Sequence, residues 1–274
     1  MVVARLVWGK MGAGFVANAL VTWLIGSLVI LGVSALSVVG MLVARRHIHD
    51  AVREGHNDVA GFFFATVGVV YAVILAFQVF AVWERYSAAE DDVSNEASAE
   101  INLLRATRGL PDGLRQQVQG QLKQYAEDVV NEEWSQMQVG LSSLKARNEQ
   151  NNVSRLLESW QPQTSADSAR YNELLVDMDQ WASQRTLRFN DVAKSLPGIL
   201  WVLLIGGGTL TVGFSFLFHM ENVAVQGIMT AITAALIAGT LFFIVNLDRP
   251  FSGPQHVPPE PFVHMLDHFN DFVS

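Results

Sequence analysis

One apolar stretch of the chain carries the residues whose spacing could serve ion passage. Val69, Val73 and Phe77 recur at intervals of four, which places them on one face of a helix. Rings of apolar side chains can close a pore by excluding water, although such a stripe can equally face lipid or a neighbouring helix. Polar residues then follow in the order Gln78, Glu84, Arg85 and Glu90. A polar residue at membrane depth usually faces a bundle interior or a water path.

The composition sets the class of protein that must hold these residues. Of 274 residues, 50% are hydrophobic and only 16% are charged, and the longest apolar runs lie near the two ends. This distribution indicates a membrane protein with a polar insert rather than a globular enzyme. The chain has no cysteine, which excludes disulfides and thiolate chemistry. No nucleophile and base pair stands out, so we expect no enzymatic activity and no cofactor.

Four stretches are long and apolar enough to cross a bilayer, which takes about 20 residues. They are Leu20–Val43, Val59–Val82, Leu196–Phe218 and Val223–Val245. The sequence therefore predicts an all-α membrane protein with four transmembrane helices and a helical insert between the second and third. A signal peptide is an alternative for the first stretch, but its apolar run is long and no small-x-small cleavage site follows.

Four parts of the chain follow from these spans. They are an N-terminal segment with the first two spans (1–82), an insert (83–195), the last two spans (196–246) and a tail (247–274). An even number of spans places both termini and the insert on one side. Most basic residues near span ends lie on that side, which predicts that it is cytoplasmic. The pair Arg45 and Arg46 after the first span favours the inverted orientation.

The insert is expected to be helical. The second span should continue to about Arg108, where "GLPDG" (109–113) breaks it. Further helices are predicted at 114–138, 141–160 and 168–195, the last preceded by the capping sequence "TSAD" (164–167) and continuing with a kink into the third span. The insert carries more acid than base, which argues against nucleic acid as a partner. Most of its charges are interpreted as solvated surface.

Smaller features add three expectations. "GGG" (206–208) in the third span indicates flexibility or close packing rather than a phosphate loop. Phe262, Met265, Leu266, Phe269 and Val273 predict an amphipathic tail helix docked on the insert or on the membrane. Metal binding or pH sensing is an alternative for His47, His49 and His56, which are interpreted as solvated. His264 and His268 have the i, i+4 spacing of a metal pair, but no third ligand accompanies them.

Two tracts carry a resemblance to a known family. "LAFQVFAVWERYSAAE" (75–90) resembles the second-helix tract of bestrophins, with Phe77 and Arg85 eight residues apart and Trp83 and Tyr86 as flanking aromatics. "LDRPFSG" (247–253) resembles the acidic-x-Pro-Phe-Gly tract after the last bestrophin transmembrane helix. "HNDVAGF" (56–62) makes the chain look closer still to the bacterial bestrophin-like membrane proteins of unknown function.

The resemblance implies a homopentameric ion channel of the bacterial inner membrane, with lipid and permeating inorganic ions as its partners. Val69, Val73 and Phe77 would form the hydrophobic neck of the pore, followed by Gln78, Glu84, Arg85 and Glu90 at its exit. Acidic residues after the neck favour cations over anions. The segment "PQHVPPEPF" (254–262) holds one acid, so no calcium site is expected there. The alternative function is a non-conducting membrane scaffold or sensor whose cytosolic helices bind a protein partner.

Overall fold

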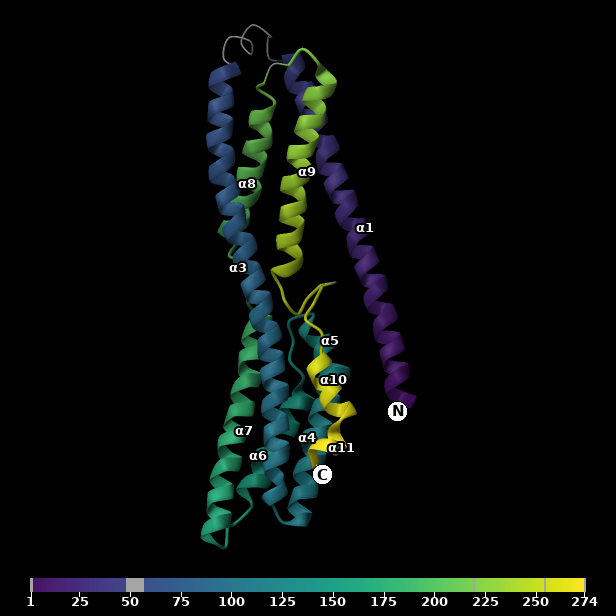
Figure 1. Ribbon diagram of the computed structural model, residues 1–274, viewed down its shortest axis with the longest axis vertical. Helices are drawn as coiled ribbons and strands as arrows, with labels where there is room; N and C mark the ends of the chain where they lie inside the picture. The colour runs from purple at the N-terminus through teal and green to yellow at the C-terminus, as the bar shows by residue number, and fades with distance from the viewer. Residues whose placement is uncertain (1, 48–56, 219, 254, 274) are drawn as a thin grey trace. The chain divides into compact units, whose positions relative to one another are not determined.

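The computed structural model describes residues 2–47, 57–218, 220–253 and 255–273, and these form helices and turns with no strand (Figure 1). Four helices are long and apolar enough to cross a membrane, over Leu20–His47, Gly61–Gly109, Gly198–Ser215 and Val223–Leu247. The predictions of an all-α fold and of four membrane-spanning helices are therefore confirmed. Internal contacts divide the chain into two units, and each is considered by itself.

The membrane unit comprises Arg5–Glu84 and Ser195–Asp248. Its helices are α1 (Val2–His47), the first part of α3 (Asn57–Ala106), α8 (Gly198–Ser215) and α9 (Val223–Leu247). Glycine allows large side chains to approach the helices closely. A Cβ on Gly26 would lie 2.6 Å from the Phe242 ring, and a Cβ on Gly207 would lie 2.6 Å from the Tyr71 ring. Close packing at small residues therefore holds this unit together, as the glycine-rich third span predicts.

The insert unit comprises Arg85–Lys194 and Arg249–Ser274. It contains the second part of α3, the 3₁₀ turn η1 (Thr107–Gly109), α4 (Asp112–Asp128), the π-helical segment η2 (Val129–Glu133), α5 (Trp134–Met137), α6 (Leu144–Glu158), α7 (Ser165–Val192), α10 (Glu260–Asp267) and α11 (Phe269–Val273). The predicted break after Arg108 is confirmed. The predicted capping box is also present, with the side chains of Thr164 and Asp167 each accepting from the other's backbone N–H.

Two predictions about helix continuity are wrong. The stretch 114–138 is not one α-helix, because η2 inserts a π-turn between α4 and α5. The last insert helix does not kink into the third span either. It ends at Val192, and α8 begins after Pro197. The Leu196 N–H instead donates to the Asp248 carboxylate at 2.6 Å, so this side chain satisfies a buried backbone donor before α8 starts.

The tail docks on the insert rather than on the membrane. Phe262 and Met265 of α10 are fully buried in the core of the insert unit. The Trp134 indole N–H donates to the Val257 carbonyl at 2.9 Å, and its ring meets Phe251 at 5.9 Å between centroids. The predicted docking of an apolar tail face on the insert is therefore confirmed, but the tail forms two short helices separated at His268 rather than one.

Candidate functional site

Tyr71 fixes the rotation of α3 within the membrane unit. Its ring packs against Gly207 and Gly208 of α8, and its hydroxyl donates to the Leu204 carbonyl at 2.7 Å. The side chain is almost completely buried. Since the hydrogen bond and the glycine contacts act together, α3 presents this face to its own bundle.

The stripe predicted from the sequence lies on the other side of α3. At about 100° per residue, Val69 and Val73 lie about 160° from Tyr71 around the helix, and Phe77 about 120°. These three side chains are 64%, 49% and 66% exposed, respectively. The described part of the chain leaves about half or more of each side chain uncovered, so lipid or another molecule must cover the rest in the membrane.

The same two faces continue where α3 leaves the membrane. The helix has 50 residues, about 75 Å at 1.5 Å per residue, which is more than twice the thickness of the hydrocarbon core. Its inward side chains lie within one arc centred near Tyr71, and they are buried at Val82, Ala89, Glu96, Glu100 and Leu103. Its opposite side carries Glu84, Asp91, Asn95 and Ser98, all of which are exposed. One uncovered stripe therefore changes from apolar to acidic along a single helix.

The predicted exit residues separate on these faces. Glu84 is exposed on the stripe that holds Phe77. Gln78 and Arg85 lie on the side of Tyr71 and are partly buried, and the Gln78 side-chain oxygen has no hydrogen-bond partner among the described residues. Glu90 lies to one side of the stripe and is exposed. Partial burial of its carboxyl group, and then the charges of Asp91 and Glu260, raise its pKa. The structure thus brings Glu84 together with the neck residues, and it does not bring Gln78, Arg85 or Glu90 to that stripe.

A pair of carboxyl groups joins α3 to α7. Burial raises the pKa of Asp92 to about 6, and a hydrogen bond to Asp191 and the charge of Asp191 add to the shift. Asp191 is buried, and its Oδ1 accepts from the Lys194 ammonium at 2.6 Å, which opposes the rise. Asp92 therefore changes its charge near pH 6, at the contact between α3 and α7.

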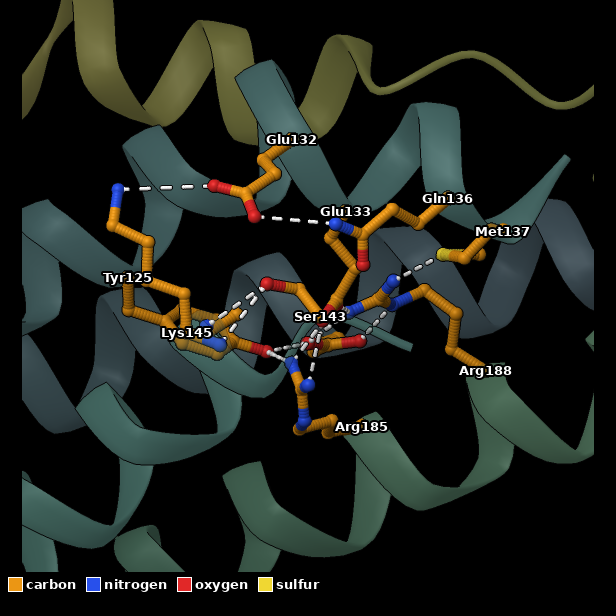
Figure 2. A network of polar contacts seen from close by, with 11 residues as sticks. Tyr125, Glu132, Glu133, Gln136, Met137, Ser143, Lys145, Arg185 and Arg188 are labelled. Atoms are coloured by element: carbon orange, nitrogen blue, oxygen red, sulfur yellow. Dashed lines mark hydrogen bonds and ion pairs between the residues drawn. The ribbon is translucent and has the colours of Figure 1, made fainter. Parts of the chain in front are cut away.

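A buried ionic network lies in the core of the insert unit, and Figure 2 shows its side chains converging from separate helices. Arg188 of α7 donates to Glu96 of α3 at 2.5 and 3.1 Å and to Glu133 of η2 at 2.7 Å. Arg185 binds Glu133 through both guanidinium nitrogens at 3.0 and 2.7 Å and donates to the Tyr125 hydroxyl at 2.6 Å. Two arginines thus balance two carboxylates, and the π-turn delivers Glu133 between them.

Glu100 lies one turn after Glu96 and remains outside this balance. It is fully buried, and neither carboxyl oxygen has a hydrogen-bond partner among the described residues. Burial first, and then the negative charge of Glu96, raises its pKa well above the usual range, although Arg188 and Arg185 oppose the rise. Burial therefore favours the neutral form of Glu100, which adds no charge to the two arginines and two carboxylates of the network.

The sequence gives little sign of this network, which we interpreted as part of the solvated surface. Its one local signal is the spacing of like charges on single helix faces, Glu96 with Glu100 and Arg185 with Arg188. Such pairs repel one another on an exposed helix. They become stable when an opposite pair faces them.

The histidines do not form a metal site in the described part of the chain. His264 and His268 stack with their ring centroids 4.3 Å apart. The Nδ1 atom of His47 lies 2.9 Å from the Val43 carbonyl, and that of His268 lies 3.0 Å from the His264 carbonyl. His49 and His56 lie outside the described residues. No three His, Cys, Asp or Glu side chains of the described residues are grouped as metal ligands.

These observations define a class of protein: four membrane-spanning helices, a helical insert after the second, and an uncovered stripe along that second helix. The sequence of residues 31–262 matches the family model described as a Bestrophin-like domain. The chain belongs to the bestrophin-like family, a family of ion channels rather than enzymes. No curated protein matches it.

Solved structures show the same fold. A bacterial bestrophin homologue from Klebsiella pneumoniae is similar to this chain with a TM-score of 0.67 and 13% identity, over 89% of this chain and 98% of the other. A point variant of such a homologue gives a TM-score of 0.69 at 13% identity, over 89% and 99% of the two chains. At this identity the likeness concerns the fold alone.

Proposed function

We propose that this chain is one subunit of a homopentameric ion channel in which α3 lines the conduction path. The observation that carries the proposal is the uncovered stripe of α3, on which Val69, Val73 and Phe77 give way to Glu84 and Asp91. Tyr71 holds the opposite face against the subunit's own bundle. A helix with one packed face and one such uncovered face suits a path shared by several copies.

Val69, Val73 and Phe77 form the neck of the proposed pore. In a ring each residue becomes an apolar layer, and stacked apolar layers raise the free energy of water and ions in a narrow passage. The two valines make wider layers than phenylalanine does, so Phe77 is the narrowest of the three. Phe77 therefore dominates the barrier to conduction.

Glu84 and Asp91 favour cations at the end of the path. Five copies place each acid in a ring of five, and rings of acid concentrate cations. Gln78 and Arg85 lie on the packed face in one subunit, so they act on the path by supporting α3 rather than by contacting ions. Glu90 lies beside the stripe, and its negative charge adds to the preference for cations.

Ion flux through reconstituted protein tests the neck. Phe77→Ala and Val73→Ala should each increase flux into liposomes, because a barrier lowered by about 1.4 kcal/mol speeds passage about tenfold. Phe243→Ala and Leu236→Ala on α9 are matched controls, since these side chains are also exposed and apolar. They should leave flux unchanged.

The proposal of an ion channel would be overturned if the wild type and both neck variants passed no ions at any pH or voltage tested. The alternative of a non-conducting scaffold or sensor would then stand. Native mass spectrometry counts the copies in the assembly. A monomer or dimer with the stripe facing lipid would support that alternative.

Reversal potentials in asymmetric salt test the choice of ion. Glu84→Gln and Asp91→Asn should each shift the reversal potential toward lower cation preference. Asp112→Asn is the control, because this acid is 83% exposed and lies on α4. A shift of equal size in the control would assign the effect to the overall charge of the insert.

We also propose that the protein lies in the bacterial inner membrane with its insert and both termini in the cytoplasm. The excess of basic residues near the span ends on that side supports this orientation. Because the chain has no cysteine, single-cysteine variants test it directly. Val176→Cys, on an exposed side chain of α7, should resist a membrane-impermeant maleimide in intact cells and react after lysis.

A further inference from the structure

The turn between α5 and α6 exposes three large apolar side chains within six residues. Val139 is 73% exposed, Leu141 61% and Leu144 72%. Single exposed apolar residues are common on protein surfaces, but several close together indicate an interaction site. The proposed conduction path does not use this turn.

The backbone of the turn is well defined, so the exposure is built in. Gly140 has a φ of +77°, its N–H donates to the Met137 carbonyl, and the Leu141 N–H donates to the Gln136 carbonyl. This is the Schellman helix ending, in which the residue at the Leu141 position usually packs on an apolar side chain one turn earlier. Here those positions hold Gln136 and Ser135. Leu141 therefore has no apolar partner in its own turn.

Leu144 points outward for a related reason. The Ser143 hydroxyl caps α6 by accepting from the Lys145 and Ala146 N–H groups, at 3.2 and 3.3 Å. Ser143 and Ala146 are buried, and this fixes the first turn of α6 so that Leu144 faces away from the core.

The chain ties this turn to the end of a membrane span. The Ser252 hydroxyl donates to the Gln138 carbonyl at 3.0 Å, and Ser252 lies five residues after Leu247, the last residue of α9. Five residues reach at most about 18 Å when fully extended. Figure 1 shows the segment after α9 next to α5, and the Trp134 contacts with Phe251 and Val257 hold it there. One hydrogen bond and a five-residue connection therefore link this turn to the end of α9, and this short link allows the turn to reach the bilayer surface.

Basic side chains accompany the apolar ones. Arg147 follows Leu144 on the exposed surface of α6, and Arg249 is exposed in the segment after α9. Apolar side chains beside arginines suit the boundary between acyl chains and anionic headgroups, where each group meets its preferred surroundings.

We propose that the apolar turn formed by Val139, Leu141 and Leu144 inserts into the interfacial layer of the bilayer and binds lipid. The occupant is the membrane that the chain itself crosses, so the proposal does not depend on ion conduction. Insertion anchors the insert unit at the membrane surface through a contact additional to the chain connections.

Spin labels on single cysteines test the insertion in the full-length protein, because the chain has no cysteine of its own. Leu141→Cys and Leu144→Cys carry a nitroxide in vesicles of phosphatidylcholine and phosphatidylglycerol. Val176→Cys is the water-facing control, since Val176 is 65% exposed on α7. We expect the two turn labels to be more accessible to oxygen and less accessible to a polar nickel complex than the control label. Their depth should be about 5–10 Å below the headgroup boundary.

Two outcomes would overturn the proposal. Accessibilities equal to those of the Val176→Cys label would place the turn in water. Low accessibility to both reagents would show that protein covers it, as a neighbouring subunit would. Neither result bears on the flux measurements, so this test and the test of conduction fail independently.

Discussion

Arg188 is the residue whose loss most directly tests the buried ionic network. It is completely buried, and it contacts Glu96, Glu133 and the Met137 sulfur, the last at 2.8 Å. Arg188→Met replaces the guanidinium by an apolar side chain that suits the surrounding Trp134 and Phe262 rings. The substitution therefore removes the charge while creating little empty space.

The expected cost follows from which carboxylate is left alone. Glu133 keeps both of its bonds to Arg185, whereas Glu96 keeps only the hydrogen bond from Tyr125. Leaving one charge of a buried pair uncompensated costs about 3–5 kcal/mol. At about 2–4 °C per kcal/mol for a unit of this size, Tm should fall by about 6–20 °C.

Thermal unfolding of the full chain in detergent, followed by near-ultraviolet circular dichroism, measures this loss. Adding Glu96→Gln to Arg188→Met should recover part of the stability, because the uncompensated charge is then absent. Arg170→Met is the matched control. Arg170 pairs with Asp167 at 3.8 Å and is 57% exposed, and such surface pairs contribute about 0–1 kcal/mol. A Tm for Arg188→Met that equals that of the control, or a double variant no more stable than the single, would refute the assignment of the network.

Two further predictions concern the packing of α3 and its carboxyl contact with α7. Gly207→Ala should destabilise the membrane unit by about 1–3 kcal/mol, because the added Cβ would lie 2.6 Å from the Tyr71 ring. Gly206→Ala is the control in the same detergent unfolding assay. Its Cβ would enter open space, so the unfolding free energy should not change. The raised pKa of Asp92, about 6 against an ordinary 3.8, predicts stability that is full below about pH 4 and lost as the pH rises through 6. Asp92→Asn should remove that pH dependence in unfolding scans across this range; an unchanged profile would contradict the Asp92–Asp191 contact.

The fold was predictable wherever local composition determines it. The spans follow from apolar length, the break after Arg108 from Gly and Pro, and the start of α7 from the capping pair Thr164 and Asp167. These features need only the residues within a few turns of one another. The π-turn at Val129–Glu133 was missed because nothing in its own sequence requires it. It serves contacts with α7, more than 50 residues away.

The candidate site was predictable in part for the same reason. Periodicity placed Val69, Val73 and Phe77 on one face, but it could not say which face of α3 the rest of the unit covers. That choice depends on Tyr71 reaching Gly207, a contact between residues that are distant in sequence. Once this contact is known, it determines which residues of α3 face outward, both in the apolar stripe and among the acidic residues that follow it.

The two faces of α3 also account for its unbroken passage out of the membrane. Inward positions recur at intervals of three, four and seven from Tyr71 to Leu103, and outward positions recur in the same way from Val69 to Ser98. Because these intervals average close to the helical period, neither face drifts around the helix. A break in α3 at the membrane surface would allow Glu84 to rotate away from the face of the helix that carries the apolar stripe. Continuity keeps them on one line while the other face builds the core, and substitutions on the outward face therefore probe the path without disturbing the fold.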